Sequence, residues 1–159
     1  MIEKQMEEYF DRLYPICRSI TGEGYQQSLD IIREIIPFEK MDFPSGTECY
    51  DWTIPDEWNI RDAYITAPDG ERLACFKDNN LHIVGYSEPV DKEVSLDELQ
   101  KHLHTLKELP DAIPYVTSYY KRNWGFCLPY MDYKKLKKGV YKVSLNLRSV
   151  AEYLRTGSC

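Results

Sequence analysis

The amino-acid sequence predicts an α+β fold in which short helices pack on small, mainly antiparallel sheets. Apolar residues recur at helical spacing before residue 37, whereas later stretches of high β propensity are separated by turns that contain proline, glycine or asparagine. The chain has 159 residues, of which 43% are hydrophobic, so it can bury a core without disulfide bonds. Helices are therefore expected first and paired strands after them.

Two helices are expected before residue 37. In the first, apolar side chains recur along one face, at Met6, Tyr9, Phe10, Leu13 and Cys17. Pro15 should kink this helix or end it near Tyr14, because proline lacks the backbone N–H that a helix interior needs. The second helix should run from about residue 24 to 36 and bury four side chains, those of Tyr25, Leu29, Ile32 and Ile36.

Strands are expected in the middle of the chain. Residues 38–43 alternate as a strand, and residues 58–65 should form an antiparallel hairpin with residues 73–76. The turn between them is Ala-Pro-Asp-Gly at 67–70, where proline presets one φ angle and glycine supplies a positive one. A short buried strand is expected at 81–84.

A capping box follows a predicted loop at 85–91. The Ser95 hydroxyl can accept a hydrogen bond from the amide of Glu98, which marks the start of a helix. This helix should bury a stripe of leucines, at Leu96, Leu99, Leu103 and Leu106. The remaining expected elements are a β-prone stretch at 115–120, a strand at 124–128, a helix at 133–138 capped by Asp132, a strand at 140–147 and a frayed helix at 149–155.

The charge and cysteine content exclude several classes of protein. A formal net charge of −6 disfavours a nucleic-acid partner, which would need a positive field. No apolar run approaches a membrane span, and the N-terminus does not resemble a signal peptide, so a cytoplasmic protein is expected. The five cysteines are far apart, without a metal-binding spacing, and are expected to be buried thiols.

The three histidines and Cys127 are the candidates for catalysis or metal binding. His102 and His104 lie two residues apart on a predicted helix, on faces about 200° apart, so they cannot share a metal and should be solvated. His82 is expected to be a hydrogen-bonded core histidine rather than a ligand. Cys127 lies in an apolar stretch that raises a thiol pKa, so a structural cysteine is favoured over a nucleophile.

An aromatic cluster is the candidate binding surface. Aromatic ring faces beside an arginine suit stacking on a saccharide or a peptide, although core packing explains the same residues. The candidate residues are Tyr115, Tyr119, Tyr120, Arg122 and Trp124.

Several blocks of sequence follow one another in a recognisable order. The clearest is Leu-Tyr-Pro-Ile-Cys-Arg-Ser-Ile-Thr-Gly at residues 13–22, and the others lie at 44–47, 51–55, 57–65, 80–82, 114–120 and 124–127. Together these blocks, which cover about residues 8–143, resemble a bacterial family of aminopeptidase-like proteins related to di-zinc aminopeptidases. Members of this family are often encoded beside polysaccharide-biosynthesis genes.

The resemblance implies a domain layout and an incomplete α/β peptidase fold. Residues 1–43 would be the leading helices and first strand of the peptidase-like domain, 44–138 an inserted α+β module, and 139–159 a return strand with a divergent tail. In the family, histidines and carboxylates C-terminal to the matched region hold two zinc ions, and a glutamate is the general base. The resemblance therefore assigns no catalytic residue and no metal ligand to this chain.

Two functions are expected from these observations. The first is an N-terminal fragment of a zinc aminopeptidase-like hydrolase, which lacks the metal site and is inactive alone. The alternative is a non-catalytic module that binds a saccharide or a peptide. Apolar faces left uncovered would also favour self-association.

Overall fold

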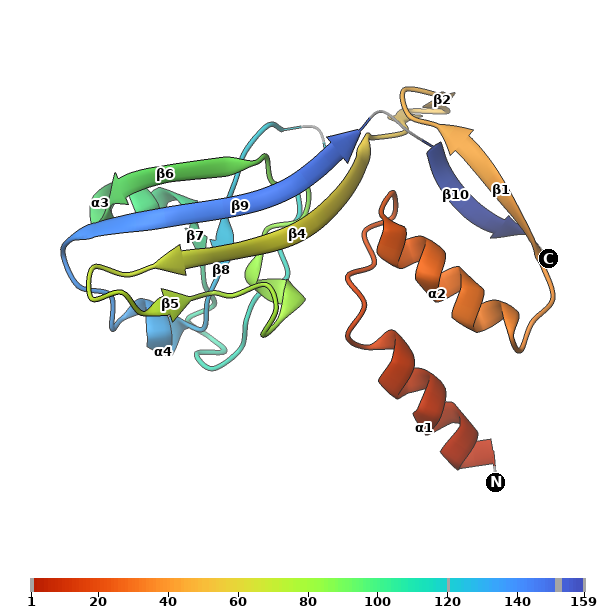
Figure 1. Cartoon of the computed structure of the whole chain (residues 1–159), viewed down its shortest axis with the longest axis horizontal. Helices are drawn as coiled ribbons and strands as arrows, with labels where there is room; N and C mark the ends of the chain where they lie inside the picture. Colours follow the sequence, from red (N-terminus) through yellow and green to blue (C-terminus); the bar gives the residue numbers. More distant parts are fainter. Residues whose placement is uncertain (1, 120, 151–152, 159) are drawn as a thin grey trace. The chain divides into compact units, whose positions relative to one another are not determined.

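The computed structural model describes residues 2–119, 121–150 and 153–158. The chain forms two compact units, one made of residues 1–59 and 149–159 and the other of residues 60–148. Short helices and small, mostly antiparallel sheets make up both units, which confirms the predicted α+β class (Figure 1). The predicted three-part layout of 1–43, 44–138 and 139–159 refers to a larger peptidase fold and stays a prediction.

Unit 1 contains two helices and two small sheets. The helices are α1 (Ile2–Leu13) and α2 (Glu23–Arg33), and both were predicted. Strand β1 (Glu39–Pro44) pairs antiparallel with β10 (Tyr153–Ser158), and β2 (Glu48–Cys49) pairs with β3 (Trp52–Thr53). The predicted burial in α2 is only partly right, because the helix ends before Ile36, which is exposed, and Ile31 is buried instead.

The loop between the two helices is held by side-chain hydrogen bonds to the start of β4 (Glu57–Thr66). The Ser19 hydroxyl donates to the carbonyl oxygen of Trp58 at 3.0 Å, and the Asn59 side-chain oxygen accepts from the amide of Glu23 at 2.7 Å. Backbone atoms also approach closely here. An ideal Cβ on Gly24 would lie 2.0 Å from the carbonyl oxygen of Cys17, so only glycine fits without displacement.

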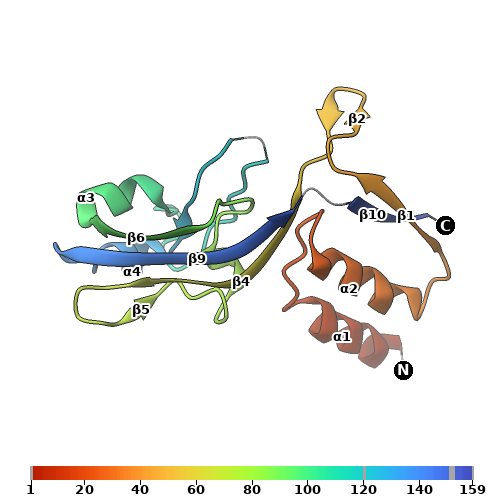
Figure 2. The same cartoon turned by 45° about the horizontal axis from the view of Figure 1, so that its top comes forward.

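Unit 2 is built on a four-stranded sheet with the order β5-β4-β9-β6 (Figures 1 and 2). Strand β9 (Val140–Val150) pairs antiparallel with β6 (Val90–Ser95), and β4 pairs with the short β5 (Arg72–Leu73). Alternate residues of β9 point into the core, as period-two patterning requires; these are Tyr141, Val143 and Leu145. Gly70 has φ +88° in the predicted turn, and β5 pairs antiparallel with β4, so the hairpin is confirmed, but its return strand covers residues 72–73 rather than the predicted 73–76.

Several local predictions in unit 2 are wrong. Residues 80–82 form a 3-10 helix (Asn80–His82) rather than a strand, and β6 begins inside the predicted loop at 85–91. The Ser95 cap is confirmed, since its hydroxyl accepts from the Glu98 amide at 3.3 Å. The helix after it, α3 (Leu96–Leu99), is nevertheless short. It passes through a 3-10 turn into β7 (Leu103–His104), which pairs in parallel with β8 (Phe126–Cys127). Because of this pairing, Leu103 lies in a strand and the predicted helical stripe of leucines does not form.

The C-terminal helices were also predicted in the wrong places. Helix α4 spans Tyr130–Tyr133, so Asp132 lies inside it rather than at its N-cap. The frayed helix predicted at 149–155 is wrong, because β9 continues to Val150 and β10 begins at Tyr153; residues 151 and 152 lie outside the described residues. Of the β-prone residues 115–119, Thr117 alone forms a bridge, to Gly85.

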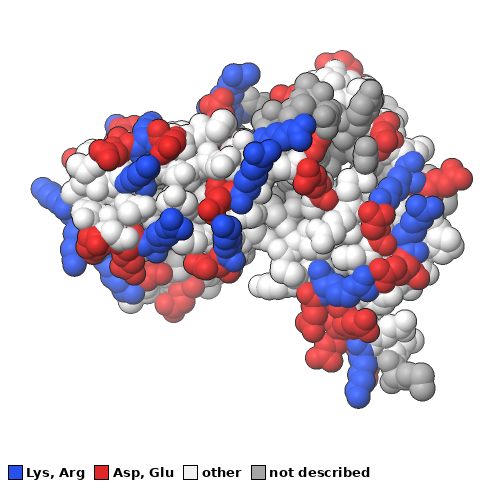
Figure 3. Space-filling view, viewed as in Figure 1, with Lys and Arg blue, Asp and Glu red and all other residues white. Residues whose placement is uncertain are grey.

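No helix in the described part of the chain is both long enough and apolar enough to cross a lipid bilayer. On the face of the molecule seen in Figure 3, acidic and basic side chains are interspersed.

Candidate functional site

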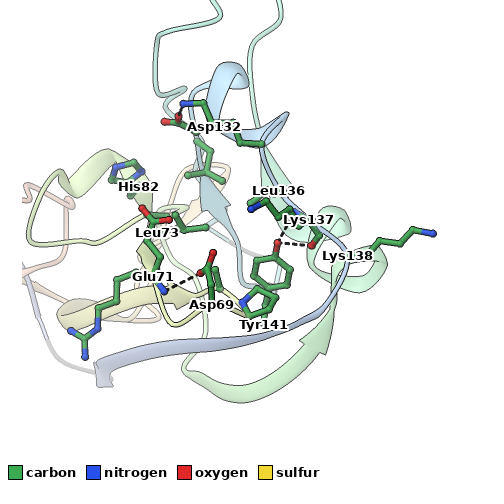
Figure 4. Close-up of a pocket in the computed structure, with 15 residues that line it drawn as sticks. Asp69, Glu71, Leu73, His82, Asp132, Leu136, Lys137, Lys138 and Tyr141 are labelled. Atoms are coloured by element: carbon green, nitrogen blue, oxygen red, sulfur yellow. Dashed lines mark hydrogen bonds and ion pairs between the residues drawn. The ribbon is translucent and has the colours of Figure 1, made fainter.

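A cleft of about 670 Å³ lies within unit 2 (Figure 4). One side is the β4–β5 hairpin, which contributes residues 67–69 and 71–74, and the opposite side is formed by Asp132 in α4 and by residues 135–138 after it. His82, Leu128 and Tyr141 complete the lining. Volumes of this size are typical of small-molecule sites.

The floor of the cleft is apolar and tightly packed. Ala74, Leu128 and Tyr141 are all buried. The Tyr141 hydroxyl donates to the carbonyl oxygen of Lys137 at 2.8 Å and accepts from the Lys137 amide at 3.1 Å. These two bonds, drawn in Figure 4, fix the segment that follows α4 against the sheet.

The rim of the cleft carries charges of both signs. Asp69 and Glu71 come from the hairpin, and the Asp69 carboxylate accepts a hydrogen bond from the Glu71 amide at 3.2 Å. Lys135 and Lys137 come from the opposite side. Asp132 pairs with Lys135 at 2.8 Å and, together with the more distant Glu71, raises the pKa of the Lys135 ammonium group. Of the two hairpin carboxylates, Glu71 therefore makes a small electrostatic contribution at Lys135 on the opposite side of the cleft.

Sequence reasoning identified the hairpin turn but placed no site there. The available signals were the charged residues of the turn and the lysines at 134–138. Only the neighbouring positions of β4 and β9 in the sheet bring these two segments to one cleft. That pairing joins residues far apart in the chain, and local patterns do not encode it.

The residues of the predicted aromatic surface do not all share one exposed face. Tyr115 is exposed, and Tyr119 lies 4.9 Å from the ring of Tyr86, centroid to centroid. Arg122 is largely exposed and lies 3.8 Å from the Glu88 carboxylate. Tyr120 falls outside the described residues. The aromatic surface stays a prediction for the exposed members of the set.

Trp124, by contrast, packs inside unit 2. Only 8% of it is exposed, and its ring stacks on His102 with centroids 3.7 Å apart. The Nδ1 of His102 also donates to the carbonyl oxygen of Trp124 at 2.9 Å. The prediction that His102 and His104 are solvated on one helix is therefore wrong. His104 lies in β7, where burial lowers its imidazole pKa, with a smaller contribution from His102.

Cys127 has the structural role that the sequence predicts, whereas His82 is hydrogen-bonded as predicted but lies in a 3-10 helix and is only partly buried. His82 donates from Nδ1 to the carbonyl oxygen of Cys127 at 2.8 Å. The Cys127 side chain is fully buried, and burial raises its thiol pKa to about 12, which opposes a nucleophilic role. The expectation that all the thiols are buried is wrong for Cys49, which is exposed; Cys159 lies outside the described residues.

The exposed Cys49 thiol and the buried Cys127 thiol should react at different rates in the folded chain. With a pKa of about 12, roughly one Cys127 thiol in ten thousand is ionised at pH 8. In a Cys159→Ser variant, a maleimide at pH 8 should modify Cys49 quickly and leave Cys127 intact until urea unfolds the chain. Peptide mass mapping at timed intervals measures both rates, and equal labelling of the two cysteines in the folded chain would contradict the buried assignment.

Comparison with known proteins gives a family match and two relatives. The model of a family described as a domain of unknown function, DUF2172, matches residues 57–148. The chain is 50% identical over 136 residues to a Clostridium acetobutylicum protein named "Putative polysaccharide biosynthesis protein with aminopeptidase-like domain", covering 86% of this chain and 31% of that protein. It also resembles a crystal structure of a "putative peptidase" from Clostridium acetobutylicum, with 45% identity and a TM-score of 0.92.

The matched region is a minor part of these longer proteins. The structural match covers 97% of this chain and 36% of the peptidase chain. The chain therefore spans about a third of the length of the relatives that it matches.

Proposed function

The chain belongs to the family described as a domain of unknown function, DUF2172, and from its aminopeptidase-like relative we propose that it is the N-terminal part of an aminopeptidase-like hydrolase. The observation that carries this proposal is the 50% identity over 136 residues to that relative. In the whole protein, a metal-activated water would hydrolyse an N-terminal peptide or amide bond. This chain would contribute the leading helices and the inserted module.

An exposed apolar face on α1 supports this proposal. Ile2, Met6, Phe10 and Tyr14 follow one another at intervals of four residues, so they lie along one side of the helix, and each is at least 60% exposed. Covering such a stripe is favourable by about 25 cal/mol for each Å² of apolar surface removed from water. In the proposed hydrolase, the part of the relatives that this chain does not match covers this face.

The side chains described in this chain do not form a zinc site. Within residues 2–119 and 121–148, no three His, Cys, Asp or Glu side chains come together in a metal-binding arrangement. We therefore assign no catalytic step to residues of this chain, and its inactivity in isolation stays a prediction.

A chimera tests the proposed hydrolase. In the Clostridium acetobutylicum relative, the 136 matched residues are replaced by those of this chain. The relative and the chimera should both release nitroaniline from aminoacyl 4-nitroanilides with zinc present and stop when a chelator removes it. This chain alone, with the same zinc, should not exceed the blank.

Two outcomes would contradict the proposal in different ways. If neither the relative nor a folded chimera hydrolyses any aminoacyl amide, the hydrolase assignment fails. If this chain alone shows zinc-dependent turnover, the assignment of the metal site to the rest of the protein fails.

The alternative function, a module that binds a saccharide or a peptide, is favoured by one observation. Tyr119 is partly exposed beside the ring of Tyr86, and paired aromatic rings suit stacking on a sugar face. Under this alternative, Tyr119→Ala should abolish binding of an oligosaccharide or a peptide. The control is Tyr50→Asn, which removes a fully exposed tyrosine from unit 1 and should leave binding unchanged.

A further inference from the structure

The cleft of unit 2 has the composition of a ligand site, beyond the hydrolase function proposed above. Its floor is formed by buried apolar side chains, and its rim carries most of the polar groups. Small-molecule sites typically combine an apolar lining with a few polar groups at fixed positions. The arrangement of those polar groups indicates what the cleft would bind.

The acidic and basic side chains of the rim come from different segments of the chain. The hairpin contributes the carboxylates of Asp69 and Glu71, whereas Lys137 follows α4 on the other side, where Lys135 already pairs with Asp132. The Lys138 side chain extends away from the cleft (Figure 4). The hairpin also contributes Arg72, but its guanidinium carbon lies 4.0 Å from the centre of the Tyr64 ring. A ligand in the cleft therefore meets the hairpin carboxylates on one side and, on the other, the segment that carries Lys137.

His82 adds an oriented hydrogen-bond acceptor. Because the carbonyl oxygen of Cys127 can only accept, the proton of the neutral His82 ring lies on Nδ1, at 2.8 Å from that oxygen. The second ring nitrogen, Nε2, is then an acceptor, and the ring lines the cleft (Figure 4). An N–H group on a ligand would complement it.

The cleft is held in shape before any ligand arrives. Ala74, in its floor, has φ +50°, a conformation that costs free energy for any residue with a side chain. Such strain persists only where the surroundings enforce it, and it is concentrated at binding and catalytic sites. The double hydrogen bond between Tyr141 and Lys137 fixes the opposite side. A pre-formed site avoids much of the ordering cost of binding.

We propose that this cleft binds a zwitterionic ligand with an apolar side chain, namely a free amino acid or a short peptide. The ammonium group of the ligand lies at Asp69 and Glu71, and its carboxylate lies at Lys137. The apolar side chain lies on the floor formed by Ala74, Leu128 and Tyr141, and a backbone N–H donates to His82.

Four forms of one tripeptide test the charge requirement. The whole chain is titrated by calorimetry with alanyl-leucyl-alanine and with its N-acetylated, C-amidated and doubly blocked forms. Each charge-assisted hydrogen bond contributes about 1.5–3 kcal/mol, so each single block should weaken binding about ten- to hundredfold. The doubly blocked peptide should show no saturable binding.

Matched substitutions locate the binding to the cleft. Glu71→Gln and Lys137→Gln keep the side-chain size roughly constant and should each weaken binding of the unblocked peptide about tenfold or more. Glu93→Gln and Lys121→Gln change the same charges at positions outside the cleft lining and should leave the affinity unchanged. Thermal unfolding of each variant verifies that the fold is retained.

Three results would overturn the proposal. These are no saturable binding of the unblocked peptide up to about 10 mM, equal binding of the unblocked and doubly blocked peptides, or equal binding of a neutral disaccharide such as diacetylchitobiose. Because this experiment measures binding to the chain itself, its failure leaves the hydrolase proposal intact. Failure of the chimera to turn over substrate likewise leaves the cleft proposal intact.

Discussion

Replacing Phe126 by alanine should lower the free energy of unfolding of unit 2 by about 3–5 kcal/mol, the cost measured for emptying a large aromatic site in a packed core. Phe126 is completely buried in β8, and its ring meets Trp124 edge-on with centroids 6.5 Å apart. Its backbone pairs with Leu103 and bridges to Ile83. These neighbours come from three segments, so the cavity cannot close by a local shift.

Urea unfolding followed by far-ultraviolet circular dichroism measures this loss. The control is Tyr115→Ala, which removes an aromatic ring that is 73% exposed and should change the free energy by no more than about 0.5 kcal/mol. Because the chain has two compact units, the transitions are fitted separately where two are resolved. A loss below about 1 kcal/mol for Phe126→Ala would mean that this residue does not fill the core as described.

Replacing Gly24 by alanine should destabilise unit 1, although α2 is a helix and alanine is the better helix former. Helix propensity alone would favour alanine by about 1 kcal/mol. The added methyl group, however, would lie 2.0 Å from the carbonyl oxygen of Cys17 and 3.0 Å from the Ile16 side chain. Relieving overlap with backbone costs about 1–3 kcal/mol or more, so the steric effect outweighs the propensity.

The decisive measurement is whether Gly24→Ala lowers or raises the free energy of unfolding. Thermal or urea unfolding of Gly24→Ala is compared with that of Gln27→Ala, an exposed position in the same helix that should stay within about 0.5 kcal/mol of the unsubstituted chain. An increase in stability for Gly24→Ala would show that the loop before α2 does not approach the helix as closely as described.

Sequence patterns that depend only on residues close together in the chain predicted the local structure correctly. The Ser95 cap forms, Gly70 takes a positive φ in the hairpin turn, and Pro15 follows closely on the end of α1 at Leu13. Each rests on backbone chemistry within a few residues, so it is visible in the sequence. The α+β class follows from the same local patterns.

The secondary-structure predictions that were wrong share a different cause, namely pairing between strands far apart in the chain. Leu103 continues a helical leucine pattern but becomes a strand because Phe126 pairs with it, and the segment 153–158 becomes a strand because β1 pairs with it. The cleft likewise depends on the neighbouring positions of β4 and β9, which no local pattern reveals. The family resemblance was recognised because it rests on blocks of residues in order, without any need to predict the pairing.

The division of the chain between its two units sets an order for folding during synthesis. Unit 2 is a single continuous stretch, residues 60–148, whereas unit 1 is assembled from both ends of the chain. Strand β1 must therefore wait for β10, more than a hundred residues later, before its ladder of hydrogen bonds can form. The ribosome releases unit 2 complete while β1 still has no strand to pair with, so the module between β1 and β10 can mature before the flanking unit closes.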